Sequence, residues 1–376
     1  MARYELPTID QLRELGTRHE TAITIYTQTS PAPDQWEASH LGAKSAFDRA
    51  IRTLRDREEG LRHNHEQALR EHWEKIRTDE AWNKLSRSMA IFIADDFADL
   101  YVLPNELEDQ LQVGNYFDLG QIVRAVTTPQ SAFALTLSAH GWNLWEATAT
   151  TRAAELDLQG EHATDVADAT NRATVRDRGH VRRLVGDEGK KVLLEKYAKR
   201  VAEAVKSELY HQDPNTERPL FVFATDPLLD MYANADTDHR IVHLPGGPDE
   251  LRADEIDAVI REHLSTINAE TNNALVERIG DGVGRGLVAT DLSDISRAAA
   301  TGAVETLVYD FTIDILGTVD DTTGALQLDD SGYDLLSRIA IAVLDTGGTV
   351  VAVRAAEITA DIWNQKAIAG LRFAPS

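Results

Sequence analysis

The strongest chemical signal in the sequence is a concentration of positive charge near its middle. Residues 172–206 contain eleven Arg or Lys against five Asp or Glu, a local charge of +6 in a chain whose formal net charge is −24. Clustered guanidinium and ammonium groups suit phosphate binding, because they neutralise the backbone of a nucleic acid. A solvated face of an amphipathic helix would have the same composition. The stretch therefore predicts either an RNA contact or a solvated helix face.

Other familiar catalytic patterns are missing. The chain has no Cys and lacks the patterns G-x-x-x-x-G-K-[ST], G-x-S-x-G and H-E-x-x-H, so we expect no thiolate chemistry, phosphate loop, nucleophile elbow or metalloprotease site. His65 and His72 share one side of a predicted helix but are too far apart to bind one metal ion easily, and His63 points away from His65. Acidic residues are too numerous to single out a catalytic pair. We therefore expect no metal and no cofactor.

The composition is that of a folded chain. Hydrophobic residues make up 43% of its 376 residues, enough to form cores. No apolar run approaches the roughly 20 residues that span a bilayer, and the first residues lack the apolar segment of a signal peptide, so we expect a cytoplasmic protein. The excess of acidic residues repels nucleic acid at long range. Any RNA contact must therefore come from the local basic patch.

The elements before the basic stretch predict an α/β unit. Alternating β-branched and apolar residues predict strands at 21–27, 88–93 and 100–103, with weaker strands at 110–113 and 122–125. Helical periodicity covers residues 36–77. The sequence Thr-Thr-Pro-Gln at 127–130 predicts a loop that interrupts the regular secondary structure, and we place a domain boundary there.

The elements around the basic stretch predict a second α/β unit in the order β-β-loop-α-β-α-β. A hairpin turns at Ala139-His140-Gly141, a buried strand covers 219–226, a helix begins at 228, and a strand and turn follow at 241–247. A helix from residue 190 carries an apolar stripe that positions the basic side chains. Its residues are Val192, Leu193, Tyr197, Val201, Val205 and Leu209.

A long helical pattern at 249–279 leads into a third unit of about 100 residues, a usual size for a small domain. This unit alternates strands and helices, with Gly302 predicted to cap a helix. We therefore expect an N-terminal α/β domain at 1–128, a central domain at 129–248, a helical connector at 249–286 and a C-terminal α/β domain at 287–376.

The third and second units resemble a known superfamily. The phrase Gly302-Ala303-Val304-Glu305-Thr306-Leu307 resembles "G-A-V-D-T-L" at the start of the C-terminal domain of the archaeal and eukaryotic peptide release factors and of Pelota. The segments LDTGGTVVAV and IAGLRF resemble that domain's closing strands. The central hairpin, loop, basic helix and PLFVFATDPLLDMY match in order, and LPGGPDELRADEI resembles the linker of bacterial relatives. The chain is identified as resembling a bacterial member of the archaeo-eukaryotic release factor superfamily.

The resemblance implies a mixed α/β chain of three domains. The central domain would be Rossmann-like or RNase H-like, and the C-terminal one would be like the kink-turn RNA-binding ribosomal proteins. In the family, the loop before the basic helix carries Gly-Gly-Gln, whose Gln helps to position water at the peptidyl-tRNA ester. This chain has no Gly-Gly-Gln anywhere, which favours a factor that is not an enzyme. His180, in the matching loop, is a weak candidate for a catalytic base.

Our leading hypothesis is a release-factor-like protein that binds the A site of the ribosome in rescue or hibernation without hydrolysing the ester. Ribosomal RNA is the expected partner; tRNA and a translation GTPase are further partners that the resemblance implies. A peptidyl-tRNA hydrolase with a different loop residue and an acidic protein-interaction module unrelated to ribosomes remain alternatives. The predicted RNA-binding residues are Arg176, Arg178, His180, Arg182, Arg183, Lys190 and Lys191.

Overall fold

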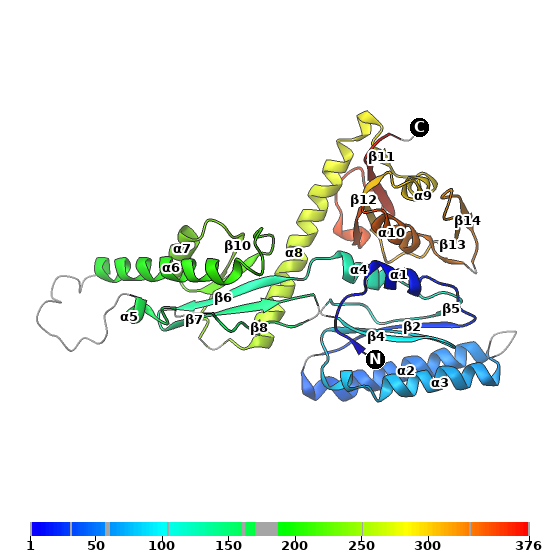
Figure 1. The fold of residues 1–376 in the computed structure, drawn as a ribbon, viewed down its shortest axis with the longest axis horizontal. Coiled ribbons are helices and arrows are strands. Elements are labelled where there is room, and N and C mark those ends of the chain that lie inside the picture. The colour runs from blue at the N-terminus through cyan, green and yellow to red at the C-terminus, as the bar shows by residue number, and fades with distance from the viewer. Residues whose placement is uncertain are drawn as a thin grey trace, which may run out of the picture. The chain divides into compact units, whose positions relative to one another are not determined.

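The computed structural model of the protein describes residues 2–30, 32–56, 61–103, 105–149, 151–159, 162–169, 187–249, 251–330 and 332–374. The chain forms two compact units (Figure 1). Met1–Pro129 and Leu264–Ser376 together form one, here called the terminal unit, and Gln130–His263 forms the other, the central unit. The mixed α/β fold expected from the sequence is confirmed. The expected division into three domains and a connector stays a prediction.

The N-terminal part of the terminal unit is a five-stranded sheet covered by helices. The strand order is β1-β4-β3-β2-β5, and α2 and α3 run side by side along one face (Figure 1). The predicted helical region at 36–77 is therefore two helices. The strands are β1 (Ala2–Arg3), β2 (Ala22–Gln28), β3 (Ser88–Ala94), β4 (Ala98–Leu103) and β5 (Gln110–Gly114), and the helices are α1 (Ile9–Leu15), α2 (Trp36–Arg55) and α3 (His63–Arg77).

One element of this part differs from the sequence prediction. Residues 122–125, predicted as a weak strand, lie in the helix α4 (Gly120–Thr127). Ile122, Val123 and Ala125 are buried, and a short apolar run that is buried on several sides has no period that separates a strand from a helix.

The C-terminal part of the terminal unit contains a four-stranded sheet, order β11-β17-β12-β16, and a three-stranded sheet, order β14-β13-β15. Gly302, at φ 68°, follows α9, and the amides of Gly302 and Ala303 bond back to its last turn, so the predicted cap is confirmed. The strands are β11 (Val288–Ala289), β12 (Val304–Asp310), β13 (Leu316–Val319), β14 (Leu326–Leu328), β15 (Tyr333–Asp334), β16 (Thr349–Val353) and β17 (Ala367–Leu371), and the helices are α9 (Leu292–Ala300) and α10 (Leu335–Asp345).

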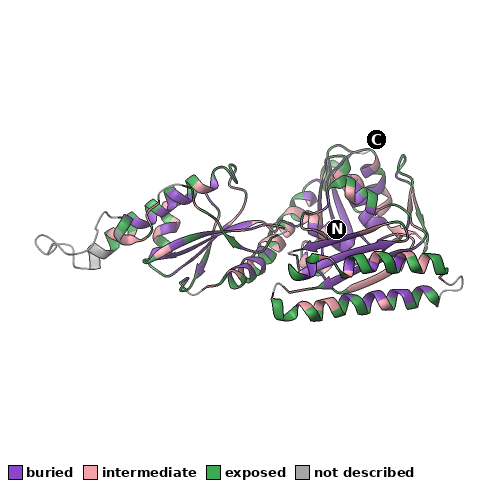
Figure 2. Ribbon diagram, turned by 60° about the horizontal axis from the view of Figure 1, so that its bottom comes forward, coloured by how far each residue is buried: buried purple, intermediate pink, exposed green. Residues whose placement is uncertain are grey.

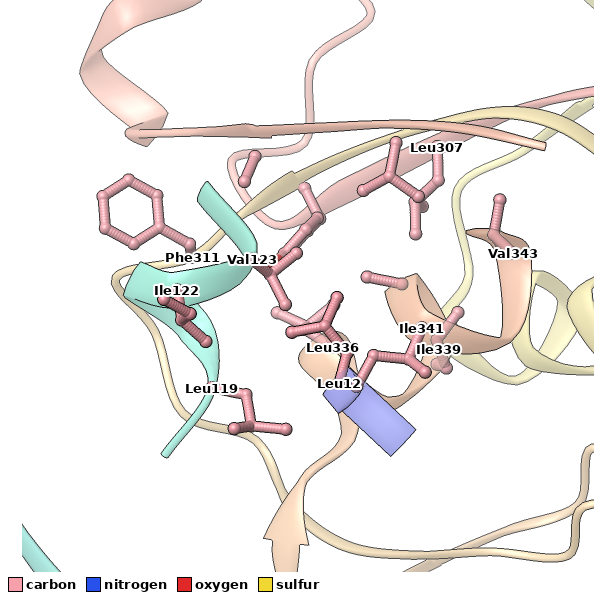
Figure 3. Close-up of a cluster of buried hydrophobic side chains, with 14 of the residues drawn as sticks. Leu12, Leu119, Ile122, Val123, Leu307, Phe311, Leu336, Ile339, Ile341 and Val343 are labelled. Atoms are coloured by element: carbon pink, nitrogen blue, oxygen red, sulfur yellow. The ribbon is translucent and has the colours of Figure 1, made fainter. Parts of the chain in front are cut away.

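The two parts of the terminal unit share one hydrophobic core. Figure 3 shows Leu12 of α1 and Ile122 of α4 among side chains of β12 and α10, such as Leu307 and Leu336. The guanidinium of Arg124 adds a polar contact, because it donates to both carboxylate oxygens of Glu357, at 3.0 and 3.1 Å. Residues more than two hundred positions apart therefore fold as one body.

The central unit is a five-stranded sheet in the order β10-β9-β6-β7-β8, packed against α6 and α7. The hairpin of β6 and β7 turns where the sequence predicted, with Ser138 opposite Gly141. The strands are β6 (Ala132–Ser138), β7 (Gly141–Ala147), β8 (Ala154–Glu155), β9 (Leu220–Ala224) and β10 (Ile241–Pro245), and the helices are α5 (Val166–Ala169), α6 (Asp187–Leu209) and α7 (Leu228–Ala235).

Helix α8 (Ala253–Gly280) begins in the central unit and ends in the terminal unit. In both units the strands are largely buried, and the helices expose the side that faces away from the sheets (Figure 2). Among the described residues, no helix combines the length and the apolar character needed to cross a membrane.

Candidate nucleic-acid interface

Five of the seven predicted RNA-binding residues lie outside the described residues. They are Arg176, Arg178, His180, Arg182 and Arg183. Lys190 and Lys191 lie near the start of α6, and Lys191 is exposed. The described part of the basic stretch is therefore α6, and the site is built from this helix.

The apolar stripe of α6 fixes which side of the helix faces water. Tyr197, Val201, Val205 and Leu209 are buried at the predicted spacing, against β6, β9 and α7. Val192, predicted on the same stripe, is 46% exposed. The packed face therefore starts about one turn later than the sequence indicated.

The opposite face of α6 is basic. Three cations on it are exposed and pair with no carboxylate whose side chain the structure describes. They are Lys196, Lys199 and Arg200. Lys206 pairs with Asp238, and this hydrogen bond raises the pKa of the lysine. Two exposed carboxylates of α6, Glu195 and Glu203, lie near these cations in sequence. We call the surface made by Lys196, Lys199 and Arg200 the basic face.

Two contacts at the far end of α6 hold this helix against the rest of the central unit. Nε2 of His162 lies 2.6 Å from Oε1 of Glu208, and the backbone amide of Gln159 donates to both oxygens of the same carboxylate. Glu208 is thus already engaged and does not neutralise the basic face. No local signal in the sequence connects residues 46 positions apart, so these partners could not have been predicted.

A second polar group supports α6 from the turn between α7 and β10. The hydroxyl of Tyr232 donates to Oδ2 of Asp236 at 2.9 Å, and Nδ1 of His239 lies 2.9 Å from the same oxygen. Burial acts to raise the pKa of Asp236, but the hydrogen bonds from His239 and Tyr232 outweigh it and hold that pKa below its usual value. All three side chains are buried, so the group stabilises the turn that carries Asp238, the partner of Lys206.

The described part of this arrangement has the chemistry to bind phosphates. Ammonium and guanidinium groups spread along one exposed helix face can contact successive phosphates of a nucleic-acid backbone, a contact that sets position rather than sequence specificity. The described part of the chain has one group of side chains with metal-ligand spacing, Glu20, His65 and Asp95, and it lies in the terminal unit. No short-range pattern in the sequence identifies this group, because its members come from three separate segments.

Comparison with known proteins agrees with the sequence resemblance. Residues 129–270 match the model of bacterial archaeo-eukaryotic release factor family 11. None of the curated proteins matches the chain.

Several solved structures are similar at low identity. A model of ribosome-bound archaeal Pelota and ABCE1 is 13% identical, with 99% of this chain and 96% of that chain covered and a TM-score of 0.41. Archaeoglobus fulgidus Pelota is 14% identical, with coverage of 77% and 80% and a TM-score of 0.36. The archaeal translation termination factor aRF1 is 13% identical, with coverage of 98% and 99% and a TM-score of 0.23. These TM-scores are too low to support any inference.

The matched residues 129–270 contain the whole central unit, including α6 with its basic face. This segment is therefore similar to the archaeo-eukaryotic release factor family that the sequence resembles.

Proposed function

We propose that this protein is a ribosome-associated, release-factor-like factor whose basic face contacts RNA phosphates. The observation that carries the proposal is the set of three exposed cations on α6, Lys196, Lys199 and Arg200, which pair with no described carboxylate and lie within the segment that matches the release factor family. A chain of net charge −24 is repelled by RNA elsewhere on its surface. Phosphate contact is therefore expected at this helix and at the basic residues that precede it in sequence.

The proposed role is ribosome rescue or hibernation without ester hydrolysis. The sequence has no Gly-Gly-Gln, the element by which the family positions water at the peptidyl-tRNA ester. Binding in the A site would then occupy the ribosome without releasing the peptide. The tRNA end and a translation GTPase are the further partners proposed for this state.

Co-sedimentation with ribosomes across a salt series tests the proposal. The variant Lys196→Glu, Lys199→Glu, Arg200→Glu reverses three cations of the basic face. Because each phosphate contact adds about 0.7–0.9 to the slope of log affinity against log salt, losing three contacts should flatten the slope by roughly 2. Binding at low salt should weaken as well.

A matched control separates position from net charge. Lys75→Glu, Lys84→Glu, Arg285→Glu changes the net charge equally, at three exposed cations of the terminal unit. We expect this control to bind with nearly the salt slope of the unchanged protein. Equal loss of binding in both variants would mean that general repulsion, and not the basic face, sets the affinity. No binding by the unchanged protein at low salt would reject the function.

A further inference from the structure

Three side chains from separate segments of the terminal unit meet at one end of its first sheet. Glu20 precedes β2 and Asp95 follows β3, and these antiparallel strands pair Ala22 with Ala94, so both carboxylates lie at the same end. His65 lies in the first turn of α3, which packs against β3. The ligand atoms of Glu20, His65 and Asp95 all lie within 4.8 Å of one another.

The spacing of these groups is that of ligands rather than of hydrogen-bond partners. Nε2 of His65 lies 3.6 Å from Oε2 of Glu20, which is longer than a hydrogen bond. Two atoms bound to one tetrahedral Zn²⁺ at about 2.0–2.1 Å lie roughly 3.3–3.4 Å apart. A small inward movement of the side chains would therefore bring the three ligand atoms to the spacing of a metal site.

One of the two carboxylates is also free to act as a ligand. The carboxylate of Asp95 makes no hydrogen bond or ion pair with the described residues. The neighbouring Asp96 is engaged elsewhere, with Oδ1 3.2 Å from Nδ1 of His19. The His65 side chain is only 14% exposed, so its position is largely fixed by packing. Two carboxylates held this close repel each other unless a cation lies between them.

We propose that Glu20, His65 and Asp95 form a binding site for a divalent transition-metal ion, with Zn²⁺ as the best match. One imidazole nitrogen and two carboxylate oxygens are three protein ligands, and water completes the tetrahedron. The imidazole favours Zn²⁺ over Mg²⁺ or Ca²⁺, which prefer oxygen ligands. The ion would join the start of α3 to the end of the β2–β3 pair, and so stabilise the helical layer of the terminal unit.

One neighbouring cation competes with the ion. Nη1 of Arg62 lies 3.4 Å from Oε1 of Glu20, and the Arg62 side chain is 74% exposed. An exposed arginine can swing into solvent at little cost, because such surface pairs contribute little free energy. Removing Arg62 should therefore increase metal affinity, whereas removing a ligand should decrease it.

Calorimetric titration of the untagged full chain with Zn²⁺ tests the site. We expect one equivalent to bind and to raise the melting temperature. His65→Ala and the near-isosteric Asp95→Asn should each weaken binding by about 100-fold or more, since even changes to groups that only orient a ligand cost about 10–100-fold. Arg62→Ala should strengthen it several-fold. His63→Ala, an exposed histidine of the same helix, is the matched control and should leave the affinity unchanged.

Circular dichroism without metal shows whether each variant is folded, and Asp95→Asn keeps the test valid if His65→Ala is not. The proposal is overturned if no equivalent of Zn²⁺ binds, or if Asp95→Asn binds as tightly as the unchanged chain. An equal loss of Zn²⁺ affinity in His63→Ala would also overturn the proposal, because that result would indicate adventitious binding by surface histidines. Preference for Mg²⁺ over Zn²⁺ would exclude His65 as a ligand.

Discussion

Asp118 makes the stability of the terminal unit depend on pH. Its side chain is buried in the shared core, beside α4, where it accepts hydrogen bonds from the amide of Gly120 at 3.0 Å and from Nε2 of Gln110 at 2.6 Å. Burial raises the pKa of this carboxyl to about 7; the Gly120 amide opposes the shift, and the carboxylates of Asp314 and Asp334 add to it. The folded protein therefore holds a proton that the unfolded chain releases at much lower pH.

The sign and size of the effect follow from the two pKa values. Because the folded pKa lies above the unfolded value of about 3.9, the stabilisation is complete below about pH 4 and is lost as pH rises through about 7. Between about pH 5.5 and 8.5, the free energy of unfolding should fall by on the order of 2 kcal/mol from this group. This range stays above the isoelectric point of about 4.8 and so limits aggregation.

Asp118→Asn removes the titration while keeping the shape. The new amide group faces Nε2 of Gln110, which costs a constant amount of free energy at every pH. Urea unfolding at several pH values should therefore show that the variant has a lower free energy of unfolding than the unchanged protein at low pH. At high pH its free energy of unfolding should approach or exceed that of the unchanged protein. Asp361→Asn, the same substitution at an exposed site, should show a pH-independent difference. The reasoning would be refuted if the difference in free energy of unfolding between Asp118→Asn and the unchanged protein stayed constant between about pH 5.5 and 8.5.

Three further outcomes are expected. Gly120→Ala should destabilise the protein by about 1–3 kcal/mol in thermal unfolding, because the added Cβ would lie 2.7 Å from a backbone carbonyl oxygen. The control is Gly42→Ala, in α2 with open space around it, which should be neutral or slightly stabilising. Arg124→Ala should cost on the order of 2–3 kcal/mol, since it leaves the half-buried carboxylate of Glu357 without its bidentate partner. The purified protein should release no peptide from stalled ribosome complexes, and release that is abolished by His180→Ala would contradict the non-enzymatic role.

Short-range residue patterns were enough to predict many of the local elements and the character of the basic face. The β6–β7 hairpin and the buried strand β9 follow from short-range apolar patterns and turn residues. The same holds for α6, where apolar residues at helical spacing bury one side and so leave Lys196 and Lys199 exposed on the other. The family resemblance also rests on such contiguous phrases, and the match over residues 129–270 bears it out.

Which distant segments lie together depends on packing between elements, and no local pattern predicts it. The shared core joins Leu12 to Leu336, and the metal-ligand group joins Glu20 to His65 and Asp95. Residues 122–125 read as a strand in isolation but form α4, because packing on several sides overrides a short local pattern. A period in the sequence specifies which face of an element is apolar, but not which partner covers it. That choice depends on the shape and burial of surfaces that exist only after the chain has folded.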